Sequence, residues 1–161
     1  MVIVYAVKGF DGANLPLDNP LQVPAHRYSG RVLASGKEAM RTTPKFERGR
    51  LLGDVVFVSG TAAIKGEDSE FSEDTRVQAL GAIDVVEHLV APSNISPNCS
   101  AFRFGYLRVY VRRPQDLEPV REMFISHFRD TPIHFLQADI CRPELLLELE
   151  GVGRALPFLR P

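Results

Sequence analysis

Residues 138–151, Ala-Asp-Ile-Cys-Arg-Pro-Glu-Leu-Leu-Leu-Glu-Leu-Glu-Gly, place a thiol, a guanidinium and carboxylates in and beside a strongly apolar run. Successive side chains of a β-strand point to opposite faces of the sheet. From residue 145 onward, alternation therefore separates two sets: Leu145, Leu147 and Leu149 on one face, and Leu146, Glu148, Glu150 and Val152 on the other. The second face either is solvated or lines a pocket or subunit interface where acid chemistry is possible.

The composition predicts one soluble globular domain over residues 1–161. Hydrophobic residues make up 45% and charged residues 24% of the chain, enough for one core. The formal net charge of −1 leaves no basic stripe, so we expect neither nucleic acid nor an anionic membrane as a partner. No apolar run approaches the ~20 residues of a membrane span.

The N-terminus and the cysteines predict a cytoplasmic protein. Residues 1–8 are apolar but lack a basic region and a cleavage site, which favours a strand over a signal peptide. Cys99 and Cys141 form no C-x-x-C pair, so free thiols are expected. No His, Cys or Asp cluster has metal-ligand spacing, and no glycine-rich phosphate loop occurs, so we expect no metal and no cofactor.

The chain divides at about residue 50. Residues 1–50 are expected to hold the N-terminal strand and a long irregular arm rich in Pro, Gly and basic residues, from residue 13 on. An arm of this length is usually functional or wrapped on a partner. Residues 51–155 carry the regular patterns of a folded core.

The sequence patterns within residues 51–155 predict two helices and four strands. Asp74 is a good N-cap for a helix over residues 75–89, whose buried stripe would be Val77, Leu80, Ile83 and Val86. A second amphipathic helix is expected over residues 116–128, with Pro119 harmless in its first turn. The expected strands are 55–60 (continuing through 61–64 after a bulge), 104–112, 132–139 and 145–152.

This order predicts an α+β fold with two helices on one face of a mixed sheet. The other face would carry aromatic and charged groups, among them Tyr106, Arg108, Tyr110, Glu148 and Glu150. An uncovered face of this kind suggests subunit packing, with polar pockets at the seams.

The element order and several short motifs resemble the RidA/YjgF family of small trimeric proteins, which have a chorismate-mutase-like α+β fold. The resemblance covers residues 50–155 and implies a homotrimer. The matching pieces are Val58-Ser59-Gly60-Thr61, Gln78-Ala79-Leu80, the passage from Val109-Tyr110-Val111-Arg112 to Leu117, and Leu147-Glu148-Leu149-Glu150. The family's older label, endoribonuclease L-PSP, finds no support in the charge of this chain.

A closer resemblance is to the C-terminal, RidA-like half of the chorismatases, which hydrolyse chorismate. It covers most of the chain, including the arm. The matching text is residues 19–25 (Asn-Pro-Leu-Gln-Val-Pro-Ala), 58–64 (Val-Ser-Gly-Thr-Ala-Ala-Ile), 110–112 (Tyr-Val-Arg), 138–142 and 146–151. The segment at residues 132–135 lacks the arginine with which RidA deaminases hold the substrate carboxylate.

Two residues are candidates for catalysis. The resemblance implies that Glu148 is the acid that protonates a leaving group or positions water; the alternative is a carboxylate solvated or paired with Arg108 or Arg142. Cys141 matches a chorismatase cysteine that helps select the product, and Arg142 beside it would lower the pKa of the thiol. The alternative for Cys141 is a small buried hydrophobe.

Further residues are candidates for substrate binding. Arg108 and Tyr110 could hold a carboxylate, or could instead pair with Glu148, Glu150 or another subunit. The backbone amides of Ser59, Gly60 and Thr61 could hold an oxygen at a bulge, or form a bulge without a ligand. Arg142 would shape the pocket.

Two functional hypotheses follow. In the first, the chain adds water to an imine or enol ether of a small carboxylated, chorismate-like metabolite at subunit-interface pockets, as a metal-free hydrolase, deaminase or lyase. In the second, it is a non-catalytic ligand-binding or interaction module, or its site is completed by a second chain, because chorismatases have an additional N-terminal half that supplies part of their active site.

Overall fold

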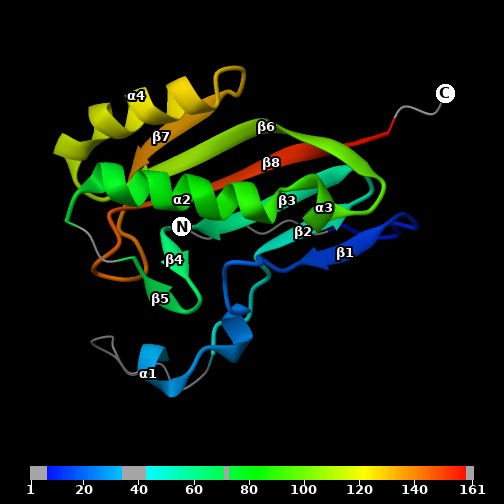
Figure 1. The fold of residues 1–161 in the computed structure, drawn as a ribbon, viewed down its shortest axis with the longest axis horizontal. Coiled ribbons are helices and arrows are strands. Elements are labelled where there is room, and N and C mark those ends of the chain that lie inside the picture. The colour runs from blue at the N-terminus through cyan, green and yellow to red at the C-terminus, as the bar shows by residue number, and fades with distance from the viewer. Residues whose placement is uncertain (1–6, 34–42, 71–72, 159–161) are drawn as a thin grey trace.

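The computed structural model describes residues 7–33, 43–70 and 73–158 and consists of a mixed sheet with helices packed on one face (Figure 1). The six strands of the main sheet are β1 Asn14–Leu17, β2 Gly49–Leu52, β3 Val55–Thr61, β6 Cys99–Val111, β7 Ile133–Gln137 and β8 Leu147–Pro157. Their order is β1-β2-β3-β8-β6-β7, with β6 and β7 parallel and the other neighbours antiparallel. A separate pair joins β4 (Ile64–Lys65) to β5 (Asp68–Ser69). This is the α+β arrangement that the sequence predicts.

Two longer helices cover the sheet, α2 (Thr75–Leu89) and α4 (Leu117–His127). Helix α2 begins where expected, because the Asp74 side chain accepts a hydrogen bond of 2.8 Å from the Arg76 N–H. The shorter helical segments are η1 Ala25–Arg27, α1 Gly30–Leu33, α3 Pro92–Ile95 and η2 Pro114–Asp116. No helix among the described ranges is long and apolar enough to cross a membrane.

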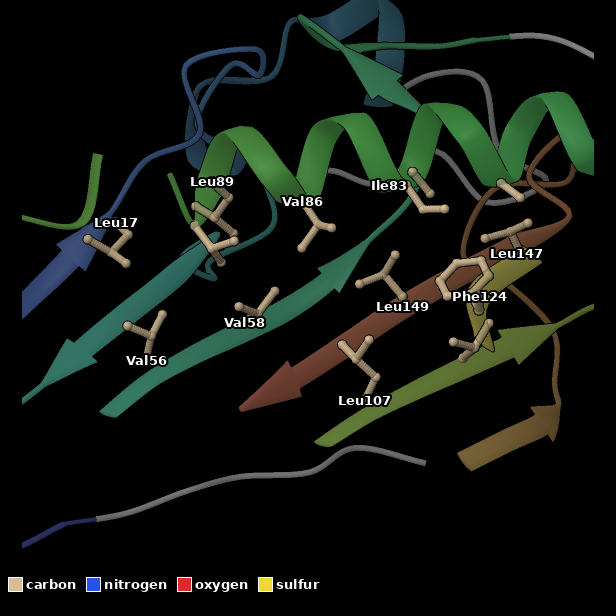
Figure 2. Close-up of a cluster of buried hydrophobic side chains, with 14 of the residues drawn as sticks. Leu17, Val56, Val58, Ile83, Val86, Leu89, Leu107, Phe124, Leu147 and Leu149 are labelled. Atoms are coloured by element: carbon tan, nitrogen blue, oxygen red, sulfur yellow. The ribbon is translucent and has the colours of Figure 1, made fainter. Parts of the chain in front are cut away.

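The main core lies between α2, α4 and the central strands. Figure 2 shows its side chains between α2 and the strands, with Phe124 of α4 among them. Alternate residues of β6 and β8 point into it, and Leu107, Val109, Leu147 and Leu149 are all buried. This confirms the predicted alternation, and it places the intervening residues of both strands on the face away from the helices.

The predicted apolar stripe of α2 is only half right. Ile83 and Val86 are buried, whereas Val77 and Leu80 are 50% and 61% exposed. The residues buried in place of those two include Gln78, Ala79 and Ala82. Small side chains let the helix approach the sheet closely, and Gln78 is accommodated because its amide bonds to backbone.

Gln78 sets the start of β8. Its Oε1 accepts the Leu146 N–H at 2.8 Å, and its Nε2 donates to the Glu144 carbonyl at 2.8 Å. The side-chain amide therefore satisfies backbone groups that a ladder would otherwise pair. The regular strand begins at Leu147, two residues later than the sequence predicts.

The arm is docked on the rest of the chain. Asn19 and Gln22 are buried, and their side-chain amides donate to the carbonyls of Val85 (2.7 Å) and Ile64 (3.1 Å). Further along, β2 pairs with both β1 and β3. The N-terminal strand predicted over residues 1–8 lies mostly outside the described residues.

Candidate functional site

Glu148 lies on the open face of the sheet, opposite Tyr110 in the β6–β8 register. The side chain is partly buried, and its carboxylate makes no hydrogen bond to any residue in the described part of the chain. Burial raises the pKa of the Glu148 carboxyl above its usual value, and the nearby charge of Glu150 raises it further. A carboxyl in this setting is suited to hold and donate a proton.

Gly60 makes the space for Glu148. The β3–β8 register shifts between Val58 and Thr61, so β3 carries an irregularity beside the carboxylate. A Cβ placed on Gly60 would lie 2.8 Å from Glu148 Cδ and closer still to its Oε1. The predicted bulge is confirmed, and its glycine leaves the position that the carboxylate fills.

Some polar groups around this bulge already make hydrogen bonds within the chain. The Ser59 N–H donates to the Arg48 carbonyl at 3.0 Å, and the Thr61 hydroxyl donates to the Ser59 carbonyl at 2.9 Å. The Ser59 amide is therefore not available to hold a substrate oxygen in this conformation. Gly60 is the member of the three that lies directly against Glu148.

Glu150 is the carboxylate that Arg108 and Tyr110 contact. Arg108 Nε lies 3.1 Å from Glu150 Oε1, and the Tyr110 hydroxyl donates to the same oxygen at 2.5 Å. Burial, followed by the hydrogen bond to Glu150, raises the pKa of Tyr110 to about 12. Arg108 and Tyr110 are therefore paired within the chain, which is the alternative to substrate binding. Their partner is Glu150 and not Glu148.

Cys141 lies on the loop between β7 and β8. The residue is exposed, so it is not a small buried hydrophobe. Partial desolvation of the thiol and the charge of Glu148 raise its pKa, and the opposing effect of Arg142 is smaller. Arg142 does lower the pKa of the thiol as predicted, but the net shift is upward because Glu148 and the surrounding protein atoms outweigh the guanidinium.

Arg142 contacts the β4–β5 turn and the arm. Its Nη1 donates to the Glu67 carbonyl at 2.8 Å and to the Ser69 hydroxyl at 3.0 Å. Its guanidinium also packs over Tyr28, with Cζ 5.3 Å from the ring centroid. Arg142 therefore joins the β7–β8 loop to the arm and does not neutralise Glu148.

Arg112 holds the same loop from the sheet side. Its Nη2 donates to the carbonyls of Ile140 (2.7 Å) and Arg142 (2.9 Å). Sequence reasoning missed this role and that of Gln78, because hydrophobic periodicity carries no signal for a side chain that bonds to distant backbone.

A cavity of about 800 Å³ lies beside β2 and β3. Its lining includes Phe46, Arg50, Phe57 and Ser59. The cavity thus reaches the residue before Gly60 without including Glu148 itself. It is roomy enough for a small metabolite, which pockets of several hundred Å³ accommodate.

Comparison with known proteins identifies relatives of the chain. No protein-family model matches it. It is 32% identical to a 3-hydroxybenzoate synthase from Streptomyces hygroscopicus, over 94% of this chain and 46% of that protein. A crystal structure of a chorismatase superposes with a TM-score of 0.75 and 28% identity, over 88% of this chain and 44% of the other. The chain is therefore similar to these two proteins over a little less than half the length of each.

The fold of the chain is also that of smaller proteins. Rv2704 from Mycobacterium tuberculosis, a member of the YjgF/YER057c/UK114 family, superposes with a TM-score of 0.60 and 16% identity, over 89% of this chain and all of that one. Yeast Mmf1 superposes with a TM-score of 0.66 and 14% identity, over the same shares. At these identities the likeness shows the RidA/YjgF fold alone. The chain spans about half the length of the curated relatives it matches.

Proposed function

We propose that this chain acts on the enol ether of a small carboxylated, chorismate-like metabolite, with Glu148 as the general acid. The observation that carries the proposal is the Glu148 carboxyl, which lies half-buried against Gly60 with its pKa raised and with no hydrogen bond to a described residue. The homology to a chorismatase and a 3-hydroxybenzoate synthase supports the substrate class.

The chemistry needs an acid that stays protonated near neutral pH. Protonated Glu148 gives its proton to the terminal carbon of the enol ether, and water adds to the oxygen-bearing carbon. The resulting hemiketal breaks its C–O bond and releases an alcohol and a keto acid. The proton lost by the attacking water returns to Glu148, so the step is balanced without a metal or a redox partner.

Neighbouring residues have supporting roles in this proposal. Glu150, held by Arg108 and Tyr110, keeps a negative charge near Glu148 and favours its protonated form. Cys141 presents a neutral thiol to the same region, where it bounds the space open to the substrate. Arg108 and Tyr110 thus act through Glu150, and the carboxylate of the substrate requires other partners.

The test is turnover by the purified chain and its Glu148→Gln variant. Chorismate is supplied, and the pyruvate expected from its enolpyruvyl ether is measured by coupled oxidation of NADH. We expect pyruvate from the wild type and a loss of at least a hundredfold in Glu148→Gln. Glu118→Gln, an exposed residue on α4, is the matched control and should retain the wild-type rate. An equal rate in Glu148→Gln and wild type would overturn the role of Glu148.

The open sheet face supports a second part of the proposal, a homotrimer with pockets at the subunit seams. That face carries the partly buried Arg108–Glu150 pair and no covering helix among the described residues. Mass measurement of the native protein by light scattering checks this: three times 17.9 kDa is expected. A monomer at micromolar concentration would contradict it.

A non-catalytic module is the second candidate function. The observation that favours it is the pairing of Arg108 and Tyr110 with Glu150, which engages two predicted substrate-binding side chains within the chain. In this case chorismate raises the melting temperature of the protein without release of pyruvate. Turnover by the single chain excludes this candidate.

A further inference from the structure

We propose that Arg48 and Arg142, whose guanidiniums both lie close to the Tyr28 ring, form a binding site for the carboxylate of a small organic ligand. This rests on the proposed function for the identity of the ligand, and it names the partners that the substrate carboxylate would otherwise lack. The three residues come from the arm, from the start of β2 and from the loop that carries Cys141.

Arg48 is a buried cation. Its side chain is almost wholly enclosed, with 4% of the residue exposed. Its Nη2 donates to the Val23 carbonyl at 3.0 Å and to the Tyr28 hydroxyl, both of which are uncharged acceptors. Its Nε is buried without a hydrogen-bond partner. Buried charges are normally paired, so a cation with neutral partners is an unusual feature.

Two cations converge on one aromatic ring. Arg48 Cζ lies 5.5 Å and Arg142 Cζ 5.3 Å from the centroid of Tyr28. Arg142, like Arg48, bonds to neutral acceptors, and its Nη2 is buried without a partner. Two like charges around one ring repel each other, and the aromatic face offsets this only in part.

These two cations lack a counter-charge within the described residues. No ion pair joins Arg48 or Arg142 to a carboxylate in the described ranges. The acidic side chains nearest along these contacts are engaged elsewhere: Glu67 accepts from the Ser29 backbone and hydroxyl (2.7 and 2.6 Å), and Glu144 accepts from the Ser69 hydroxyl (2.7 Å). A carboxylate that enters this region would accept hydrogen bonds from the unused N–H donors, since the arginine fork matches its geometry.

Arg142 is next in the chain to Cys141, whose thiol lies near the proposed acid. Cys141 precedes Arg142, and its thiol is influenced by the charges of both Glu148 and Arg142. A ligand whose carboxylate is held at Arg142 would therefore extend past Cys141 toward Glu148. The arm then has a functional reason to dock on its own chain, because Tyr28 brings the two guanidiniums together.

The experiment compares two probes that differ in one charge. 3-Hydroxybenzoate and its uncharged counterpart 3-hydroxybenzyl alcohol are titrated by calorimetry into wild type, Arg48→Met, Arg142→Met and Arg154→Met. Arg154 is the matched control, an exposed arginine paired with Asp54. We expect the wild type to bind the carboxylate and not the alcohol. Loss of either cation should weaken binding roughly tenfold to a hundredfold, with no change in Arg154→Met.

Each outcome decides the proposal. Equal binding of the two probes, or undiminished binding by Arg142→Met, overturns it. Should Arg48→Met fail to fold by circular dichroism, the partly exposed Arg142→Met decides alone. If Glu148→Gln binds 3-hydroxybenzoate in a way that depends on the two arginines, and the wild type is inactive on chorismate, the carboxylate site is supported. The proposed role of Glu148 as an acid is then overturned. Turnover that depends on Glu148 but not on either arginine would support the role of Glu148 and overturn the carboxylate site.

Discussion

The Glu148 carboxylate lies where a side chain at residue 60 would have to lie. A Cβ on Gly60 would be 2.8 Å from Glu148 Cδ and 3.4 Å from its Cγ, with Oε1 nearer than either. Both residues belong to strands that pair through an irregular register, so the backbone of β3 shapes the space for the acid on β8. This relationship links a local feature of the sequence, a glycine at a bulge, to the proposed chemistry.

Gly60→Ala should displace the acid without unfolding the protein. The atom it meets is the end of a flexible side chain, which can rotate away, so we expect the free energy of unfolding to change by less than about 1 kcal/mol. Turnover should fall by about a hundredfold, as for other misplaced catalytic groups. Gly105→Ala is the control, because a Cβ there meets its nearest atom at 3.4 Å. Wild-type turnover in Gly60→Ala would show that the position of Glu148 is not critical.

Gln78→Met should destabilise the fold. The substitution keeps the length of the side chain but leaves the Leu146 N–H and the Glu144 carbonyl without their buried partner. Each buried group left unsatisfied costs about 1–3 kcal/mol, so a loss of about 2–4 kcal/mol is expected in urea unfolding. Gln115→Met, at an exposed position in η2, should change stability by less than about 0.5 kcal/mol. A similar small change in Gln78→Met would contradict this account of the start of β8.

Glu148→Gln should become more stable relative to the wild type as the pH rises from acid to neutral. The folded state raises the pKa of Glu148, so it binds more protons than the unfolded state between the usual value of 4.5 and the raised value. Stability from this group is therefore highest below that window and falls as pH rises through it. The variant has no ionisable group at this position, so it does not lose stability as the pH rises through this window.

The measurement is the melting temperature of both proteins from pH 4 to 8. The variant should gain on the wild type as pH rises, and Glu118→Gln should show no such trend. A difference between Glu148→Gln and wild type that is constant with pH would mean that folding does not perturb this carboxyl.

Glu150→Gln should lower the pKa of Glu148. Removal of the Glu150 charge takes away the like-charge effect on Glu148, while burial remains. The pKa should therefore move toward, but not reach, its ordinary value. Titration of the side-chain carboxyl carbons by NMR follows this directly, with the Glu148 signal assigned from its absence in Glu148→Gln. An unchanged midpoint would exclude electrostatic coupling between the two carboxyls.

The sequence predicts some features because they depend on local chemistry. The α2 helix begins after Asp74 and ends at Leu89 as expected, since capping and periodicity act over a few residues. The buried face of α2 is predicted less well. Leu80 is exposed and Gln78 is buried, because the close approach of helix and sheet and the hydrogen bonds to residues 144–146 outweigh hydrophobicity.

The order of α2, α4 and the strands β3, β6, β7 and β8 follows from the amino-acid sequence alone, whereas β1 and β2 lie where it predicts an irregular arm. The face on which Glu148 and Glu150 lie also follows from the sequence, because side chains alternate with period two along any strand. The folded chain was needed to show which carboxylate is paired with Arg108 and which has no hydrogen-bond partner among the described residues. That choice depends on the register of β6 against β8 and on the irregularity at Gly60, which bring together groups far apart in the chain. Pairing and burial depend on distances of a few ångströms, and the linear pattern does not contain those distances.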